Sequence, residues 1–313
     1  MSKDLKNFNA KYKTDITQDI VELDLLKKNL GDEGLKILCS IKFNKLEQLL
    51  LEENGIKNID VLAKNNFGNI LKALDLSTNK ISSLNVLATL NFPNLNHLFL
   101  NNNQISSLNV FAKVNFPNIK ELNLSSNKIS SIDIFTKVKF PLLSELDLSK
   151  NEISNIDVLA SVNFPSLTEL LLDQNKISSL DVFAKINCGQ LKKLKLEKNN
   201  LKSISVLEKI SFGKLNYLSI GDETLGENVD SLKKIKFGEL EDIYLYLNDL
   251  IDRESEKIQS IINHFEEKGI TFNFISCDDD NDLNFDDDDL NAGKSDPKNN
   301  TDGFENLLNS DIF

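Results

Sequence analysis

The chain has 313 residues, of which 40% are hydrophobic and 27% charged, a composition typical of a folded protein. Only three cysteines and two histidines occur, so a disulfide-stapled scaffold and most histidine-based catalytic or metal sites are excluded. The net charge of −12 is concentrated in residues 278–313, where twelve acidic residues and two lysines give −10, so residues 1–277 carry only −2. No basic surface of the kind that binds nucleic acid is expected.

Residues 1–19 show neither a signal-peptide core nor a myristoylation glycine, and no stretch is apolar and long enough to span a membrane. We therefore expect a cytoplasmic location, with the nucleus as the alternative. The widely separated Cys39, Cys188 and Cys277 suit a reducing compartment.

A repeat of 24 or 25 residues dominates the sequence from residue 20 to residue 276. Its frame, LxxLxLxxNxI, places asparagines at Asn54, Asn79, Asn103, Asn127, Asn151, Asn175 and Asn199. At the next 24-residue step Glu223 replaces the asparagine, and Asn248 resumes the series. A second series runs through Phe43, Phe67, Phe92, Phe116, Phe140, Phe164, Cys188, Phe212 and Phe237.

The physical meaning of this frame is a stack of short strands. In LxL the two leucines point to one side and the residue between them to the other, which is the period of a strand. Stacked copies bury the leucines in one continuous core beneath a parallel sheet. We expect the asparagines to form an internal hydrogen-bonding ladder and the phenylalanines a second internal spine.

Each repeat also predicts a short helix on its opposite side. The expected helix N-caps are Asp60, Asn85, Asn109, Asp133, Asp157, Asp181 and Ser205. Phe-Pro or Phe-Gly then ends each helix. The predicted fold is an α/β solenoid, with a curved parallel sheet on its concave side and short helical turns on its convex side.

The frame resembles that of leucine-rich repeat proteins, with seven clear units between Leu46 and Ser211. The 24-residue length is similar to the intracellular branch of that family, which includes a regulatory subunit of protein phosphatase 1. Residues 23–38 resemble the longer, helix-bearing unit of the ribonuclease-inhibitor type. Residues 255–269, with Ile258, Ile261, Ile262 and Phe265 at helical spacing, predict a cap helix, and residues 270–275 a closing strand.

Residues 277–313 are predicted to be an acidic disordered tail. Its tip carries Phe304, Leu307, Leu308, Ile312 and Phe313, which suggests either chance apolar residues or a short motif that docks on a partner or on the repeats.

The family resemblance implies a non-enzymatic scaffold or regulatory subunit that binds a protein through its concave face. The alternative is an acidic-tailed repeat protein that binds basic proteins such as histones, or that regulates a phosphatase. We predict no catalytic residue, no metal site, no cofactor and no nucleic-acid or membrane partner, and a monomer when isolated. On the concave face, the candidate partner-binding residues are Phe99, Glu145, Asp147, Glu169, Leu171, Lys193, Lys195, Tyr217, Tyr244 and Tyr246. Exposed aromatic residues often anchor interfaces.

Overall fold

The structure, a computed structural model, describes residues 2–222, 226–247 and 254–275. The repeats lie in one compact unit, Met1–Phe274. The predicted tail from residue 277, including its apolar tip, and both Glu223 and Asn248 lie outside the described residues.

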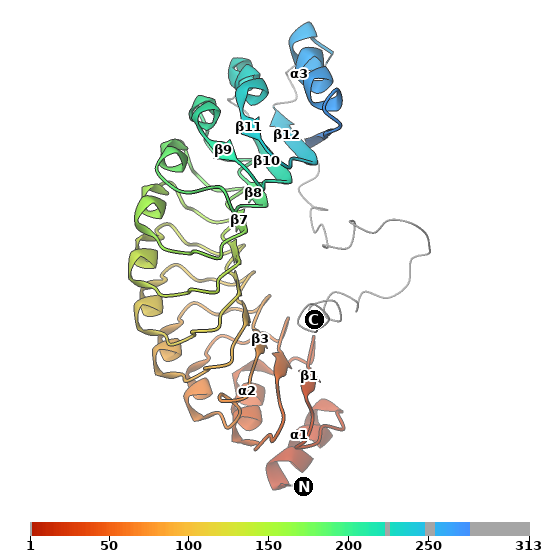
Figure 1. Ribbon diagram of the computed structural model, residues 1–313. Coiled ribbons are helices and arrows are strands. Elements are labelled where there is room, and N and C mark those ends of the chain that lie inside the picture. Colours follow the sequence, from red (N-terminus) through yellow and green to blue (C-terminus); the bar gives the residue numbers. More distant parts are fainter. Residues whose placement is uncertain (1, 223–225, 248–253, 276–313) are drawn as a thin grey trace. The chain divides into compact units, whose positions relative to one another are not determined.

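An eleven-stranded sheet forms one side of the described repeats, with its strands in chain order (Figure 1). The strands are β1 (Glu22–Asp24), β2 (Gln48–Leu50), β3 (Ala73–Asp75), β4 (His97–Phe99), β5 (Glu121–Asn123), β6 (Glu145–Asp147), β7 (Glu169–Leu171), β8 (Lys193–Lys195), β10 (Tyr217–Asp222), β12 (Asp242–Leu247) and β13 (Thr271–Ile275). From β1 to β12 neighbouring strands pair in parallel, and Leu98, Leu122 and Leu146 are direct partners in adjacent strands. The predicted α/β solenoid, with a parallel sheet on one side and short helical turns on the other, is confirmed.

Short 3₁₀ helices lie on the side of each repeat opposite the sheet (Figure 1). They are η1 (Asp60–Lys64), η2 (Asn85–Thr89), η3 (Asn109–Lys113), η4 (Asp133–Lys137), η5 (Asp157–Ser161), η6 (Asp181–Ala184), η7 (Ser205–Lys209) and η8 (Gly226–Lys234). Two-residue strands β9 (Ser211–Phe212) and β11 (Lys236–Phe237) pair near this side at the C-terminal end. Three-residue turns are tighter than α-helical ones, which suits segments of four or five residues.

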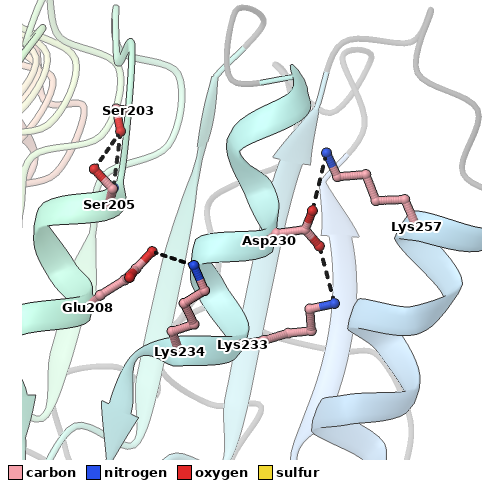
Figure 2. Close-up of polar contacts among 7 residues, drawn as sticks. All are labelled: Ser203, Ser205, Glu208, Asp230, Lys233, Lys234 and Lys257. Carbon is pink, nitrogen blue, oxygen red and sulfur yellow. Dashed lines mark hydrogen bonds and ion pairs between the residues drawn. The ribbon is translucent and has the colours of Figure 1, made fainter.

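The predicted N-caps are wrong by one position. Asp60, Asn85, Asn109, Asp133, Asp157, Asp181 and Ser205 are the first residues of the 3₁₀ helices, and the residues before them make no side-chain cap. Instead, a side chain two residues upstream accepts the backbone N–H of the first helical residue. Asn155 Oδ1 does so for Asp157 at 2.7 Å, and Ser203 Oγ for Ser205 at 3.2 Å (Figure 2). A Ser or Asn side chain thus accepts this N–H at the start of each helix from η1 to η7.

The asparagine ladder is present in all seven clear repeats. In each, the side-chain amide donates to backbone carbonyls of its own and the preceding repeat. From Asn79 on, the side-chain oxygen accepts the N–H of the isoleucine that ends the LxxLxLxxNxI frame of the preceding repeat. Asn151 Nδ2, for example, lies 3.0 Å from Leu124 O and 3.1 Å from Leu148 O, while Ile129 N–H donates to its Oδ1 at 3.0 Å. One side chain thus satisfies buried backbone groups of two repeats at once.

Where the ladder register breaks, a neighbouring side chain takes over part of its role. Glu223 occupies the expected position in the sequence, but Asp222 Oδ2 accepts the Leu201 N–H at 3.0 Å. This bond is equivalent to the one from Ile177 N–H to Asn199 Oδ1. The ladder is therefore continued by a carboxylate from the last residue of β10.

The aromatic spine is largely buried. Phe43, Phe67, Phe92, Phe116, Phe140 and Phe212 are each at most 2% exposed, whereas Phe164 and Phe237 are half-buried. The ring centroids of Phe140 and Phe164 lie 6.5 Å apart, and those of Phe212 and Phe237 lie 6.1 Å apart. Cys188 occupies the position between Phe164 and Phe212 in this series, and its side chain is 3% exposed. The thiol of Cys188 is smaller than the ring found at the other positions of this series.

We expect Cys188→Phe to fold and to raise the free energy of unfolding by about 1 kcal/mol, because a ring there would extend the spine and bury more apolar surface. Urea denaturation measures the change. Cys39→Phe is the matched control, since Cys39 is buried in α2 (Gly31–Ser40) outside the spine and an added ring should overpack the core there. A destabilised Cys188→Phe variant would show that the neighbouring residues already fill the space.

Both ends of the repeats carry α-helices. The first repeat contains α2, as expected for residues 23–38, and α1 (Lys3–Tyr12) adds Leu5 and Phe8 to the core. At the other end α3 (Glu256–Glu266) and β13 confirm the predicted cap helix and strand.

Exposed ion pairs tie the C-terminal cap to the last repeats (Figure 2). Asp230 of η8 contacts Lys233 at 3.2 Å and Lys257 of α3 at 3.3 Å, and Lys234 contacts Glu208 of η7 at 3.5 Å. Exposed pairs of this kind each contribute about 0.2–1 kcal/mol. The buried Ile258, Ile261 and Phe265 attach the cap to the core.

Candidate functional site

The side of the sheet that faces away from the leucine core carries three rows of side chains, because alternate residues of a strand point to the same side. We call this side the sheet face. Its first row includes His97, Glu121, Glu145, Glu169, Lys193, Tyr217 and Asp242, and its second row includes Asp75, Phe99, Asn123, Asp147, Leu171, Lys195, Ser219 and Tyr244. Two residues further along lies a third row with Asp173, Glu197 and Tyr246.

All ten predicted partner-binding residues lie in these rows, but they differ in exposure. Phe99, Glu145, Glu169, Lys193, Lys195, Tyr217 and Tyr244 are half-buried. Asp147 and Leu171 are 9% exposed and Tyr246 is 5% exposed. The candidate Leu171 is therefore buried, although the strand alternation places it on the side of the sheet away from the leucine core.

Four of the predicted residues meet in one group at β8, β10 and β12. The rings of Tyr217 and Tyr244 stack with centroids 5.0 Å apart. Lys193 Nζ and Lys195 Nζ lie 5.7 Å and 5.8 Å from the Tyr217 centroid, within the range of a cation–π contact. We call these four residues the aromatic–lysine cluster. Burial, and then the nearby Glu197 carboxylate, raise the pKa of Tyr217, so its hydroxyl is protonated and able to donate at neutral pH.

A glycine beside the cluster lets the strands approach closely. Gly221 has φ +139°, a conformation that side chains rarely adopt, and a Cβ there would overlap the backbone carbonyl of Tyr246. Lys198 Nζ lies 5.2 Å from the Tyr246 ring, next to the cluster. The glycine therefore sets the position of Tyr246 on the sheet face.

Three glutamates lie side by side in the first row, one on each of β5, β6 and β7. Glu121 pairs directly with Glu145, and Glu145 with Glu169, in the strand register. At one end His97 Nδ1 lies 2.8 Å from Glu121 Oε2, and at the other Lys193 Nζ lies 3.8 Å from Glu169 Oε2. We call these three residues the glutamate ladder.

Two acidic side chains of the second row have a local structural role. Asp75 Oδ1 accepts the Ser77 N–H at 2.7 Å, and Asp147 Oδ1 accepts the Ser149 N–H at 2.9 Å. Asn123 Oδ1 accepts the Ser125 N–H at 3.0 Å in the same way. This hydrogen bond therefore requires an oxygen acceptor but not a negative charge. Burial raises the pKa of Asp75 to about 6 and that of Asp147 in the same direction.

Asp75→Asn should therefore stabilise the protein at neutral pH. A carboxyl group whose pKa is raised on folding binds protons more tightly when folded. Its contribution to stability is greatest below the unfolded pKa of about 4, and falls as the pH rises towards about 6. Removing the charge while keeping the hydrogen bond should raise the free energy of unfolding at pH 7 by roughly 1–3 kcal/mol. Urea titrations between pH 4 and pH 8 measure this effect.

The control for this prediction is Asn123→Asp, which introduces the charge at the equivalent position. It should make stability fall more steeply with pH than in the unchanged protein. Equal pH dependence of the unchanged protein and both variants would contradict the argument.

Two buried side chains, Glu197 of the third row and Ser219 of the second, were not among the predicted binding residues. Glu197 is 4% exposed and Ser219, in the second row beside it, is fully buried. Burial comes first among the causes that raise the pKa of Glu197, and Ser219 opposes the rise. Burial also raises the pKa of Asp173 well above its usual range, with the charges of Glu197 and Asp147 adding to the effect. A third row, formed by the residues two positions before each ladder asparagine, would have included Glu197.

Several kinds of chemistry receive no support from the described part of the chain. No group of three or more His, Cys, Asp or Glu side chains in residues 2–222, 226–247 and 254–275 is arranged to hold a metal ion. In the same ranges no helix combines the length and apolarity needed to cross a bilayer. Burial raises the pKa of the Cys188 thiol to about 11, which keeps it protonated and a poor nucleophile at neutral pH.

Comparison with known proteins places the centre of the chain among leucine-rich repeats. The family model "Leucine rich repeat" matches residues 117–177, and "Leucine Rich repeats (2 copies)" matches residues 93–137. No curated protein matches the chain significantly. The leucine-rich repeat class predicted from the sequence is thus supported, and no catalytic family is indicated. The resemblances to the phosphatase-1 regulatory subunit and to the ribonuclease-inhibitor type stay predictions.

Similar solved structures include two internalins from Listeria monocytogenes. Internalin inlF is 22% identical, with 88% of this chain and 89% of that chain covered and a TM-score of 0.47. Internalin C2 is 19% identical, with 78% and 92% covered and a TM-score of 0.49. The plant peptide hormone receptor RGFR1, solved in complex with RGF2, is 18% identical, with 67% and 38% covered and a TM-score of 0.42.

Proposed function

We propose that this protein is a non-enzymatic scaffold or regulatory subunit that binds a partner protein on its sheet face, with the aromatic–lysine cluster as the anchor. Leucine-rich repeats in general act as protein-interaction modules, because stacked strands present an extended, regular surface. The observation that carries the proposal is the stacked Tyr217–Tyr244 pair, with two lysines within 6 Å of the Tyr217 ring.

The cluster has the properties of an interface anchor. Tyrosine offers a large contact area with few rotatable bonds, so little side-chain entropy is lost when a partner covers it. The hydroxyl of Tyr217 stays protonated and can donate a hydrogen bond. The two lysines make cation–π contacts with the Tyr217 ring, so the cluster is preorganised before a partner binds.

The experiment compares partner capture by the full chain with capture by the double variant Tyr217→Ala, Tyr244→Ala. Proteins retained from a cell extract are identified by mass spectrometry, and their binding to the purified variants is then measured. We expect at least a tenfold loss of affinity, as for truncation of paired anchor residues. Thermal denaturation must first show that the variant is folded.

The matched control is Leu26→Ala, Leu142→Ala, which truncates two large apolar side chains that are 41% and 43% exposed elsewhere. It should bind like the unchanged protein. If the tyrosine variant binds normally, the anchor lies on another surface. If the retained proteins include a phosphatase, the hypothesis that this protein is a regulatory subunit gains support. If histones dominate and salt releases them, the acidic-tail alternative gains support.

A further inference from the structure

Two buried carboxyl groups lie side by side just beyond the ends of β7 and β8. Asp173 is 7% exposed and Glu197 is 4% exposed. The register of the two strands pairs Leu171 with Lys195, two residues earlier in each repeat. It continues beyond the strands, because the Gln174 N–H donates to Glu197 O at 2.9 Å. Asp173 and Glu197 therefore occupy neighbouring positions in adjacent repeats, at the strand spacing of about 4.8 Å.

The two side chains lack the hydrogen bonds that buried carboxylates need. Asp173 Oδ1 and Glu197 Oε2 are buried, and neither has a hydrogen-bond partner within the described residues. Buried acceptors without donors cost free energy, and charged ones cost more. Two ionised carboxylates cannot bond to each other, because both only accept. If both groups were ionised, the pair would combine charge burial, mutual repulsion and unsatisfied oxygens.

A single proton held between the two groups reduces all of these costs. A protonated carboxyl group has one O–H donor, and its bond to a carboxylate is short and strong. Burial is the largest cause that raises the pKa of both groups, and the charge of Glu197 raises the pKa of Asp173 further. Both groups therefore bind protons more tightly in the folded chain than in the unfolded chain.

We propose that Asp173 and Glu197 share one proton at neutral pH, and that its loss as the pH rises rearranges the neighbouring aromatic–lysine cluster. The shared proton is independent of the proposed function, whereas its effect on partner binding rests on that function. The pair would make the sheet face at β7, β8 and β10 sensitive to pH.

Lys195 links the carboxyl pair to the cluster. Its charge lowers the pKa of Asp173 and that of Glu197, and its Nζ lies 5.8 Å from the centroid of the Tyr217 ring. While the pair holds its proton, it carries a single negative charge, and Lys195 keeps its contact with the ring. When the proton leaves, the second negative charge draws the ammonium group towards the carboxylates and away from the ring.

Other charged and titratable groups near the pair adjust the pH at which the proton leaves. They are Asp147 and Lys150 of the β6 repeat, Lys198 of the β8 repeat, Tyr217 of β10 and Tyr246 of β12. The charge of Asp147 raises the pKa of Asp173, whereas the charge of Lys198 lowers the pKa of Glu197. The pKa of Tyr217 is itself raised, so its hydroxyl stays protonated while the pair titrates.

The pair should make the protein less stable as the pH rises. Because folding raises both pKa values, the contribution of the pair to stability is greatest below the unfolded values of about 4. This contribution falls as the pH rises through the folded values.

The first experiment follows the carboxyl carbons of the full chain by NMR from about pH 4 to about pH 10, with carbon-13 at Asp Cγ and Glu Cδ. The variants Asp173→Asn and Glu197→Gln assign the two signals. We expect both signals to change together in two separate steps, as the signals of interacting groups do. In Asp173→Asn, the Glu197 signal should change in one step, at a lower pH than the last step of the unchanged protein.

Asp147→Asn is the matched control, because it removes one carboxyl group from the adjacent repeat and leaves the pair intact. It should keep the two steps. Two results would overturn the shared proton. One is full ionisation of both groups at pH 7 in the unchanged protein, which requires no variant. The other is a Glu197 titration that is the same with and without Asp173.

The second experiment reads the cluster from the ring signals of the four tyrosines of the chain, with Tyr217→Phe to assign one of them. We expect the Tyr217 signal to shift in the step in which the pair loses its proton, and Glu197→Gln should abolish this shift. The Tyr12 signal, from α1, is the internal control and should not change in that step. A Tyr217 signal that does not shift, or a shift that persists in Glu197→Gln, would overturn the link between the pair and the cluster.

Partner binding is then measured over the same pH range with a protein retained in the capture experiment. Its affinity for the unchanged chain should fall as the pair loses its proton, and its affinity for Glu197→Gln should not. Equal pH dependence of the two chains would overturn the effect on binding. If no partner is retained, the result counts against the proposed function, and the two NMR titrations still decide the shared proton and its link to the cluster.

Discussion

Replacing Phe140 with alanine is expected to lower the free energy of unfolding by about 3–5 kcal/mol. The side chain is 2% exposed, and its ring packs against Phe164 at 6.5 Å and against Phe111 at 6.1 Å. Truncation leaves a cavity between three repeats, and the backbone cannot close it because the flanking strands are held by the ladder. Chemical denaturation of the unchanged and variant proteins measures the loss.

Leu142→Ala is the matched control, because it removes a large apolar side chain two residues away that is 43% exposed. Surface substitutions of this kind change stability by about 0.5 kcal/mol or less. A loss at Phe140 no larger than at Leu142 would show that the spine does not carry the core. In a repeat protein the Phe140→Ala variant should also lose cooperativity, since the interfaces on both sides of one repeat are weakened.

Replacing Asn151 with alanine is expected to lower the free energy of unfolding by about 2–3 kcal/mol, at the upper end of the range for removing one partner of buried polar groups. Its amide donates to three carbonyls, those of Leu124, Leu148 and Ser149, and its oxygen accepts the Ile129 N–H. Alanine leaves the buried Ile129 N–H without its acceptor, and it removes one of the two or more bonds that each of the three carbonyls accepts. Thermal and urea denaturation both report the change.

Asn155→Ala is the control, since Asn155 is exposed and accepts one N–H at the start of η5. It should cost well under half as much. The loss of stability in Asn151→Asp should lie between those of Asn151→Ala and Asn155→Ala. A carboxylate still accepts the Ile129 N–H but cannot donate to the three carbonyls. Asp222 shows that the protein accepts such a residue at the end of the ladder. If Asn151→Ala melts like the unchanged protein, the ladder contributes no stability.

Most of the fold follows from the spacing of a few residue types. The LxL leucines and the ladder asparagines recur at 24 or 25 residues, so strand positions, register and the buried side of the sheet were all predictable. The first residue of each 3₁₀ helix was not predictable. Asp60 and Asn85, for example, fit the position just before a helix as well as its first position. The distinction depends on whether Asn58 or Ser83 accepts the N–H two residues later, which is a matter of backbone geometry.

The candidate site was predictable as a surface and less so as a set of contacts. Alternation along the strands placed Tyr217, Tyr244 and the lysines on one face. It could not predict that Leu171 is covered or that Glu197 and Ser219 are buried. Those outcomes depend on the size and orientation of side chains in adjacent repeats, which a single row of the sequence does not specify.

Because every ladder asparagine bonds backbone groups of its own and the preceding repeat, the joint between one repeat and the next is chemically the same from Asn79 to Asn199. Duplication or deletion of a whole 24-residue block by recombination would therefore join compatible surfaces and need no new fold. The same event would lengthen or shorten the glutamate ladder by one residue when it falls at Glu145. Changes in the number of repeats would thus alter the row of charges on the sheet face without any point substitution.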